Sequence, residues 1–171
     1  GIKLSQRWMP IDSVGLYIPG GKTSYPSSLI MNIVPAKIAG VKRIAVTTPS
    51  QGGKFNPYIF AILKLLDVSE IYPIGGAQAI AALAYGTKSI RPVNKIFGPG
   101  NVYVNSAKKQ VFGKVGIDMI AGPSEILVVA DRYNNPNWIA ADLIAQAEHD
   151  ENSQSILITD SLNFASEIQY C

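Results

Sequence analysis

The sequence has little cysteine and little histidine: among its 171 residues, Cys171 and His149 are the only ones of their kind. A single cysteine excludes an internal disulfide and a zinc site built from cysteines, and it is typical of a reducing compartment. No apolar run approaches the roughly 18 residues that a membrane-spanning helix needs, and no signal segment opens the chain. We therefore expect a cytoplasmic protein. Because the first residue is Gly1 and not Met, the sequence can be a piece of a longer one.

Charged residues are also sparse, at 16% of the chain, and 15 basic against 12 acidic residues leave a net charge of +3. The adjacent basic pairs are Lys42-Arg43 and Lys108-Lys109, which is too scattered a pattern for a nucleic-acid-binding patch. We interpret the basic residues as a solvated surface. The hydrophobic content of 47% is enough for a core and argues against disorder.

Short β-rich runs alternate with longer helical patterns. Strands are predicted at 13–18, 43–48, 70–74, 95–97, 125–130 and 155–159, and helices at 28–39, 56–66, 76–85, 101–111, 137–148 and from 161 onward. Pro35 is expected to interrupt the first helix. This alternation predicts an α/β fold with a parallel sheet and helices on both faces. The segment Gly113–Pro123, rich in Gly, Pro and Met, is the predicted junction between two α/β units.

Glycine-rich loops follow several predicted strands, at Pro19-Gly20-Gly21, Gly75-Gly76, Gly98-Pro99-Gly100 and Gly122-Pro123. In open α/β sheets, ligands bind at the carboxyl ends of the strands, where such loops start helices. The dinucleotide fingerprint G-x-G-x-x-G is absent, because Tyr103 stands where the third glycine would be. From glycine alone, tight turns are therefore better supported than phosphate binding.

Polar side chains stand beside two of these loops. Gln78 and Asn101 each lie where a loop becomes a helix, and each can face a ligand. Asn101 suits a helix N-cap equally well, and Gln78 suits an ordinary exposed position. Ser124 suits either a polar ligand contact or a plain residue at the start of a strand, and no G-x-S-x-G elbow marks a serine hydrolase.

Gln146 and His149 are three residues apart on one predicted helix, so both can contact one ion or one substrate. A histidine near the end of a helix also suits a purely structural role, because the helix dipole favours it there. Zinc usually takes four ligands in a closed site. From spacing alone, the structural role is therefore the preferred one.

Six segments, taken in order, closely resemble the histidinol dehydrogenase family. They are SVGLYIPGG (13–21), PAKIAGVKR (35–43), GGAQAIAALAYGT (75–87), KIFGPGNVYV (95–104), IDMIAGPSEILVVAD (117–131) and DLIAQAEHD (142–150). The resemblance implies an NAD- and zinc-dependent homodimeric enzyme that oxidises L-histidinol to L-histidine in two steps. It implies an incomplete Rossmann-like fold without the standard fingerprint. Residues 1–120 would form the NAD-binding domain, and residues 121–171 would begin the substrate and zinc side.

The resemblance also assigns roles to single residues. Tyr17, Gln78 and Asn101 match NAD contacts of the family. Ser124 matches a substrate contact, and Gln146 and His149 match two zinc ligands that also touch the substrate.

The catalytic acid–base pair and the other zinc ligands of the family have no counterpart in the chain, which holds one histidine. We therefore expect no turnover by this chain alone. The alternative is a stand-alone nucleotide-binding or scaffold domain that catalyses nothing.

Overall fold

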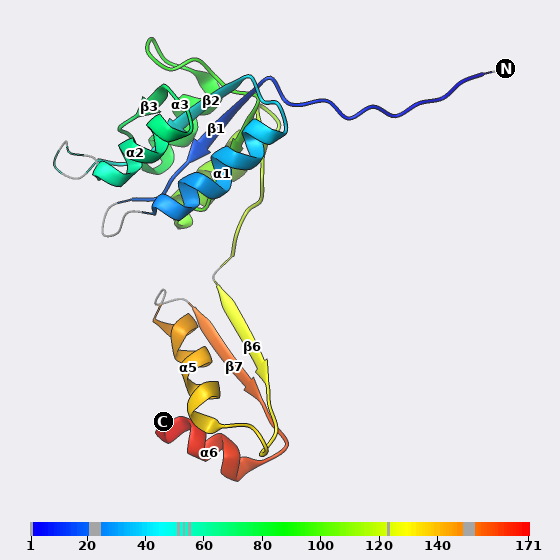
Figure 1. The fold of residues 1–171 in the computed structure, drawn as a ribbon, viewed down its shortest axis with the longest axis vertical. Coiled ribbons are helices and arrows are strands. Elements are labelled where there is room, and N and C mark those ends of the chain that lie inside the picture. The colour runs from blue at the N-terminus through cyan, green and yellow to red at the C-terminus, as the bar shows by residue number, and fades with distance from the viewer. Residues whose placement is uncertain are drawn as a thin grey trace. The chain divides into compact units, whose positions relative to one another are not determined.

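The computed structural model describes residues 2–20, 25–50, 52, 54, 56–122, 124–148 and 153–171. It consists of two compact units, Gly1–Ala121 and Gly122–Cys171, each built from strands and helices (Figure 1). The division falls within the glycine- and proline-rich segment 113–123. Among the described residues, no helix is both long enough and apolar enough to cross a membrane.

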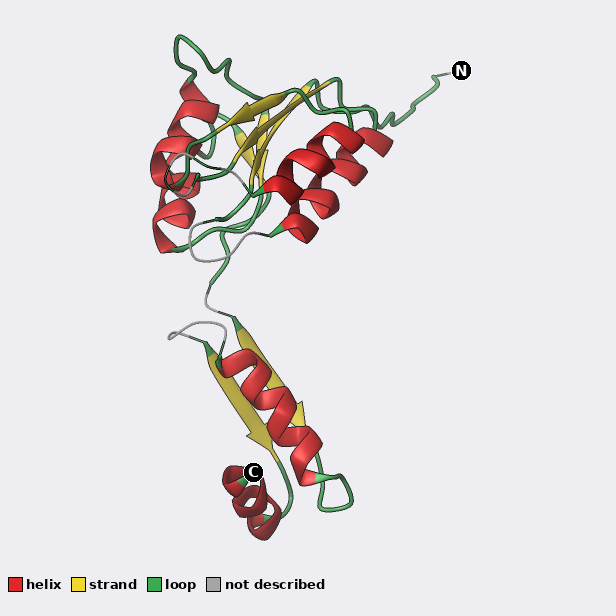
Figure 2. Ribbon diagram, turned by 60° about the vertical axis from the view of Figure 1, so that its left-hand side comes forward, coloured by secondary structure: helices red, strands yellow, loops and turns green. Residues whose placement is uncertain are grey.

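The first unit is a parallel sheet between two helix layers. Its described elements are, in chain order, β1 (Ser13–Tyr17), α1 (Pro26–Ile38), β2 (Arg43–Thr47), α2 (Pro57–Leu65), β3 (Glu70–Tyr72), α3 (Gly76–Tyr85), β4 (Lys95–Phe97), α4 (Val102–Val111) and β5 (Gly116–Ile117). The strands lie in the order β3-β2-β1-β4-β5, as in the first five strands of a Rossmann fold. Helices α1 and α2 cover one face, and α3 and α4 cover the other (Figure 2). The predicted α/β class with helices on both faces is confirmed.

Side chains of the central strand β1 alternate between the two layers. Val14 and Leu16 are buried in the cluster beneath α1 and α2, and Tyr17 is buried in the cluster beneath α3 and α4. Gly15 points toward α3, where a Cβ would come within 2.8 Å of the Leu83 side chain. Helix α3 therefore packs directly on the backbone of β1, which brings its N-terminus close to the end of that strand.

Two sequence expectations are corrected in this unit. Helix α1 continues through Pro35, because Leu29 and Ile33 anchor it against the sheet just before the proline. The carbonyl that loses its N–H partner belongs to exposed Met31, where water can solvate it. The short strand β5 lies inside the segment predicted as a junction. Its two residues include a glycine and give no periodic signal.

The second unit is smaller and has one uncovered sheet face. Strands β6 (Glu125–Val129) and β7 (Gln154–Ile158) pair in parallel, and α5 (Pro136–Ala147) and α6 (Leu162–Tyr170) pack on one face of the pair. Alternate strand residues on the other face are exposed, namely Leu127, Val129, Ile156 and Ile158. Parallel sheets are normally buried on both faces, so the exposed apolar face of this strand pair departs from the usual pattern.

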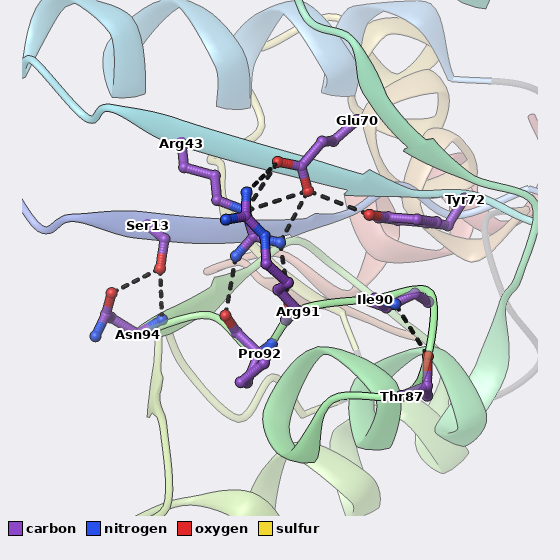
Figure 3. Close-up of polar contacts among 9 residues, drawn as sticks. All are labelled: Ser13, Arg43, Glu70, Tyr72, Thr87, Ile90, Arg91, Pro92 and Asn94. Atoms are coloured by element: carbon purple, nitrogen blue, oxygen red, sulfur yellow. Dashed lines mark hydrogen bonds and ion pairs between the residues drawn. The ribbon is translucent and has the colours of Figure 1, made fainter.

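A polar network joins the amino ends of β2 and β3 (Figure 3). Arg43 donates to both carboxylate oxygens of Glu70, with Nε–Oε1 and Nη2–Oε2 distances of 2.8 Å, and Tyr72 Oη donates to Oε2 at 3.2 Å. These hydrogen bonds from Arg43 hold the pKa of Glu70 below its ordinary value, although burial opposes the shift. Arg43 also donates to the carbonyls of Arg91 and Pro92. The expectation of a solvated surface is therefore wrong for Arg43.

Replacing Glu70 with glutamine is expected to lower the free energy of unfolding at neutral pH by about 1–3 kcal/mol, because a charge-assisted pair is lost. A carboxylate with a depressed pKa contributes stability above its unfolded pKa and loses it as the pH falls through its folded pKa. The wild-type advantage should therefore begin to fall as the pH approaches the ordinary glutamate pKa of about 4.3, and it should vanish only when the pH lies below the lowered pKa of folded Glu70. Urea unfolding of the wild type and of Glu70→Gln, at neutral pH and in acid, measures this difference in stability. The exposed Glu167→Gln variant is the control, and an equal difference at both pH values would contradict the assignment.

Candidate functional site

The loops after β1, β2 and β3 touch one another at the carboxyl edge of the larger sheet. A Cβ on Gly20 would come within 3.0 Å of Pro49, and a Cβ on Gly75 within 2.8 Å, so Pro49 packs between the loops that follow β1 and β3. Thr47, the last residue of β2, is fully buried, and its hydroxyl has no hydrogen-bond partner among the described residues. A buried unpartnered hydroxyl at this edge suits a polar ligand group or an ordered water.

Tyr17 joins the end of β1 to the start of α3. The residue is 5% exposed, and its hydroxyl accepts a hydrogen bond from the Gly76 N–H at 3.1 Å. Gly76 opens α3 with a φ of 66°, a conformation that glycine adopts without strain. Gln78 follows in the first turn of α3 and is exposed. The contact therefore fixes the first turn that carries Gln78 against the buried tyrosine.

The loop after β4 lies against the backbone of the same tyrosine. Gly98 is buried and has a φ of 125°. A Cβ at this position would collide with the Tyr17 carbonyl oxygen and lie 2.9 Å from the carbonyl carbon. Only glycine fits there, so the close approach of two backbones explains the first glycine of the Gly98-Pro99-Gly100 loop.

Asn101 caps helix α4. Its Oδ1 accepts hydrogen bonds from the N–H groups of Tyr103 and Val104, each at 3.1 Å. The N-cap interpretation is therefore confirmed. The cap occupies the carboxamide oxygen, whereas a ligand contact would use the amide nitrogen, so the two roles are compatible.

The structure brings the segments of Tyr17, Gln78 and Asn101 to one edge of one sheet. Tyr17 contacts both the first turn of α3 and the loop that leads to Asn101. The first turns of two helices thus start on either side of a buried tyrosine at the carboxyl ends of the strands. Helix N-termini at this edge are suited to bind anionic groups of a nucleotide. The assignment of these residues as NAD contacts stays a prediction.

The residues expected on the substrate and zinc side belong to the second unit. Ser124 is exposed just before β6, and its carbonyl accepts the Gln154 N–H at 3.1 Å. Gln146 is half-buried in the last turn of α5. His149 lies outside the described residues. Within the part of the chain that the structure describes, no cluster of three or more His, Cys, Asp or Glu side chains can hold a metal.

Sequence reasoning missed a buried lysine beside the glycine loop. Lys108, expected on a solvated surface, is 1% exposed and forms an ion pair with Asp118. A signal was present in the sequence, because Val104, Lys108 and Val111 share the buried stripe of α4 at helical spacing. A lysine on an apolar stripe indicates a buried partner.

The comparisons with known proteins agree on one family. The family model described as histidinol dehydrogenase matches residues 1–170. This chain belongs to the histidinol dehydrogenase family. The resemblance seen in the six sequence segments is therefore confirmed. Members of the family are NAD-dependent oxidoreductases of histidine biosynthesis.

Individual relatives of the histidinol dehydrogenase family are considerably longer than this chain. The histidinol dehydrogenase of Rhizobium meliloti (strain 1021) is 63% identical over 169 residues, which cover 99% of this chain and 39% of that protein. Histidinol dehydrogenase 1 of Trichormus variabilis is 62% identical over 168 residues, with coverages of 98% and 39%. The crystal structure of the Elizabethkingia anophelis enzyme matches with a TM-score of 0.88 and 45% identity, covering 95% of this chain and 38% of that one.

Proposed function

We propose that this chain is the NAD-binding part of a histidinol dehydrogenase that oxidises L-histidinol to L-histidine in two NAD-linked steps. The observation that carries the proposal is the position of Tyr17. Its hydroxyl binds the first turn of α3, and its carbonyl lies against Gly98 in the loop before α4. Gln78 lies in the first turn of α3, and Asn101 directly follows the loop 98–100. All three residues that match NAD contacts of the family therefore belong to one edge of the sheet.

The residues at this edge fit a dinucleotide. Gly75, the N-cap of α3, supplies no side-chain cap, and Tyr17 binds the Gly76 N–H, so the N–H groups that follow in the first turn are left for a phosphate or amide group of the cofactor. Tyr17 and Asn101 add a ring and a carboxamide for orientation. Bound NAD would accept the hydride in each oxidation, and the protein would supply its position.

The second unit would carry part of the substrate and zinc side. Gln146 and His149 offer one amide oxygen and one imidazole nitrogen, and Ser124 offers a hydroxyl toward L-histidinol. A closed zinc site usually takes four ligands, so these two donors do not complete one. The complete enzyme is proposed to be a homodimer.

By themselves, these 171 residues are proposed to bind NAD without turning histidinol over. The chain has one histidine, so it holds no second imidazole for the zinc shell or for acid–base catalysis. A nucleotide-binding domain without turnover, the second candidate function, therefore describes this chain when it is studied alone.

Titration with NAD tests the proposal. The wild-type chain is expected to bind NAD, and Gln78→Ala is expected to weaken binding by about tenfold, the equivalent of one good polar contact. Isothermal titration calorimetry measures the dissociation constant directly. In a complete enzyme, the same change should raise the Michaelis constant for NAD more than that for histidinol.

Gln110→Ala is the matched control, because Gln110 is an exposed glutamine in the last turns of α4, away from the carboxyl edge. Its affinity for NAD should equal that of the wild type. Wild-type protein that binds no NAD would reject the proposed function. Equal affinities for the Gln78 and Gln110 variants would remove Gln78 from the site.

A further inference from the structure

Both peptide groups of Gly98 are held by side chains. Its N–H donates to Asp118 Oδ2 at 2.9 Å, and its carbonyl accepts from Lys108 Nζ at 3.0 Å. Gly98 itself is buried, where an unpaired N–H or C=O would be costly. The two side chains thus satisfy the backbone of the loop at the point where it presses against Tyr17.

The two side chains also form an ion pair with each other. Lys108 reaches the loop from α4, and Asp118 reaches it from the residue after β5. Their side chains are 2% and 23% exposed. A buried ion pair is often no more stabilising than well-packed apolar residues of the same size. What apolar residues cannot supply at this place is the donor and the acceptor that Gly98 uses.

A third side chain holds the other end of the loop. Asn105 Nδ2 donates to the Gly100 carbonyl at 3.2 Å and to the Ala121 carbonyl at 3.0 Å. It therefore ties the glycine loop to the end of the chain segment that follows β5. The loop is held at Gly98 and at Gly100, immediately before Asn101.

We propose that Lys108, Asp118 and Asn105 are positioning residues for NAD: they fix the loop 98–100 and thereby set the affinity of the site. This inference rests on the proposed function. When the loop is fixed, Asn101 keeps its place as the N-cap of α4, and Gly98 covers the carbonyl of Tyr17. Without these side chains, the N–H and the carbonyl of Gly98 are unpaired and the loop moves. NAD binding then has to order the loop again, which lowers the affinity.

The test compares double variants that keep the charges balanced. Lys108→Met with Asp118→Ala removes both hydrogen bonds to Gly98. Lys108→Gln with Asp118→Asn keeps one donor and one acceptor without charge. We expect the first variant to raise the dissociation constant for NAD by about tenfold or more and the second to stay within roughly threefold of the wild type.

Glu70→Gln is the control for a general loss of stability. It removes an ion pair at the amino ends of the strands, opposite the glycine loop, and should leave the NAD affinity of the folded protein unchanged. A second readout follows the loop itself: amide hydrogen exchange at Gly98 should become about tenfold faster in the Met/Ala variant and stay unchanged in Glu70→Gln.

The outcomes separate the two proposals. If the wild type binds no NAD, the proposed function fails. If the wild type binds and the folded Met/Ala variant binds equally well, or Glu70→Gln weakens binding as much, the positioning role is wrong. Should the Met/Ala variant not fold, Asn105→Ala decides, because it removes the contacts to the Gly100 and Ala121 carbonyls and leaves Lys108 and Asp118 in place. Wild-type affinity in that variant overturns the proposal, and a loss of about fivefold or more supports it.

Discussion

Gly98→Ala is expected to lower the free energy of unfolding by about 3 kcal/mol or more and to abolish measurable NAD binding by whatever protein remains folded. The added methyl group would collide with the Tyr17 carbonyl oxygen, which belongs to the central strand. Backbone atoms of a central strand cannot move aside as a flexible side chain does. The loop 98–100 therefore has to shift instead, and Asn101, which directly follows it, shifts as well.

Gly113→Ala separates the collision from the cost of the backbone conformation. Gly113 also has a positive φ, of 95°, but a Cβ there would meet nothing within 4 Å. Its substitution is expected to cost only about 1–2 kcal/mol and to leave NAD binding intact. Chemical denaturation and calorimetry of both variants make the comparison. Equal losses would mean that the close approach of Gly98 to Tyr17 does not constrain the loop.

With histidinol, NAD and zinc supplied together, this chain alone is expected to form no NADH above background. Absence of a general base typically lowers the rate by about 10²–10⁴, and an incomplete zinc shell weakens the hold on the substrate as well. Absorbance of NADH under saturating NAD measures the rate.

The full-length Rhizobium meliloti enzyme, 63% identical over 169 residues of this chain, is the positive control in the same assay. NAD binding by the chain, measured in parallel, distinguishes an inactive but folded site from an unfolded protein. Clear turnover by the chain alone would contradict the inference that its donor set is insufficient.

Much of the larger unit could be predicted from the pattern of apolar residues. The segments β2, α3 and β4 were predicted to within a residue, because a β-branched run and an alanine-rich periodic run carry strong local signals. Strand β5 could not be found in this way. Its pairing with β4 depends on partners distant in the sequence, and two residues cannot show a period.

The candidate site was predictable in its residue types and not in its supporting contacts. Glycine and amide residues after strands pointed to Gln78 and Asn101. Nothing local revealed that Tyr17 binds the N-terminus of α3 or that Lys108 donates to the Gly98 carbonyl. Those contacts join residues 59 and 10 positions apart. They exist because parallel strands bring their carboxyl ends together.

The sequence by itself determined the family and the α/β class, because six ordered motifs and a repeated strand–helix alternation are local properties of the chain. The tertiary structure decided which groups the buried Lys108 contacts and why Gly98 has to be glycine. These depend on how closely two backbones approach and on which donors a buried peptide group can reach. Both are properties of packed neighbours that lie far apart along the chain.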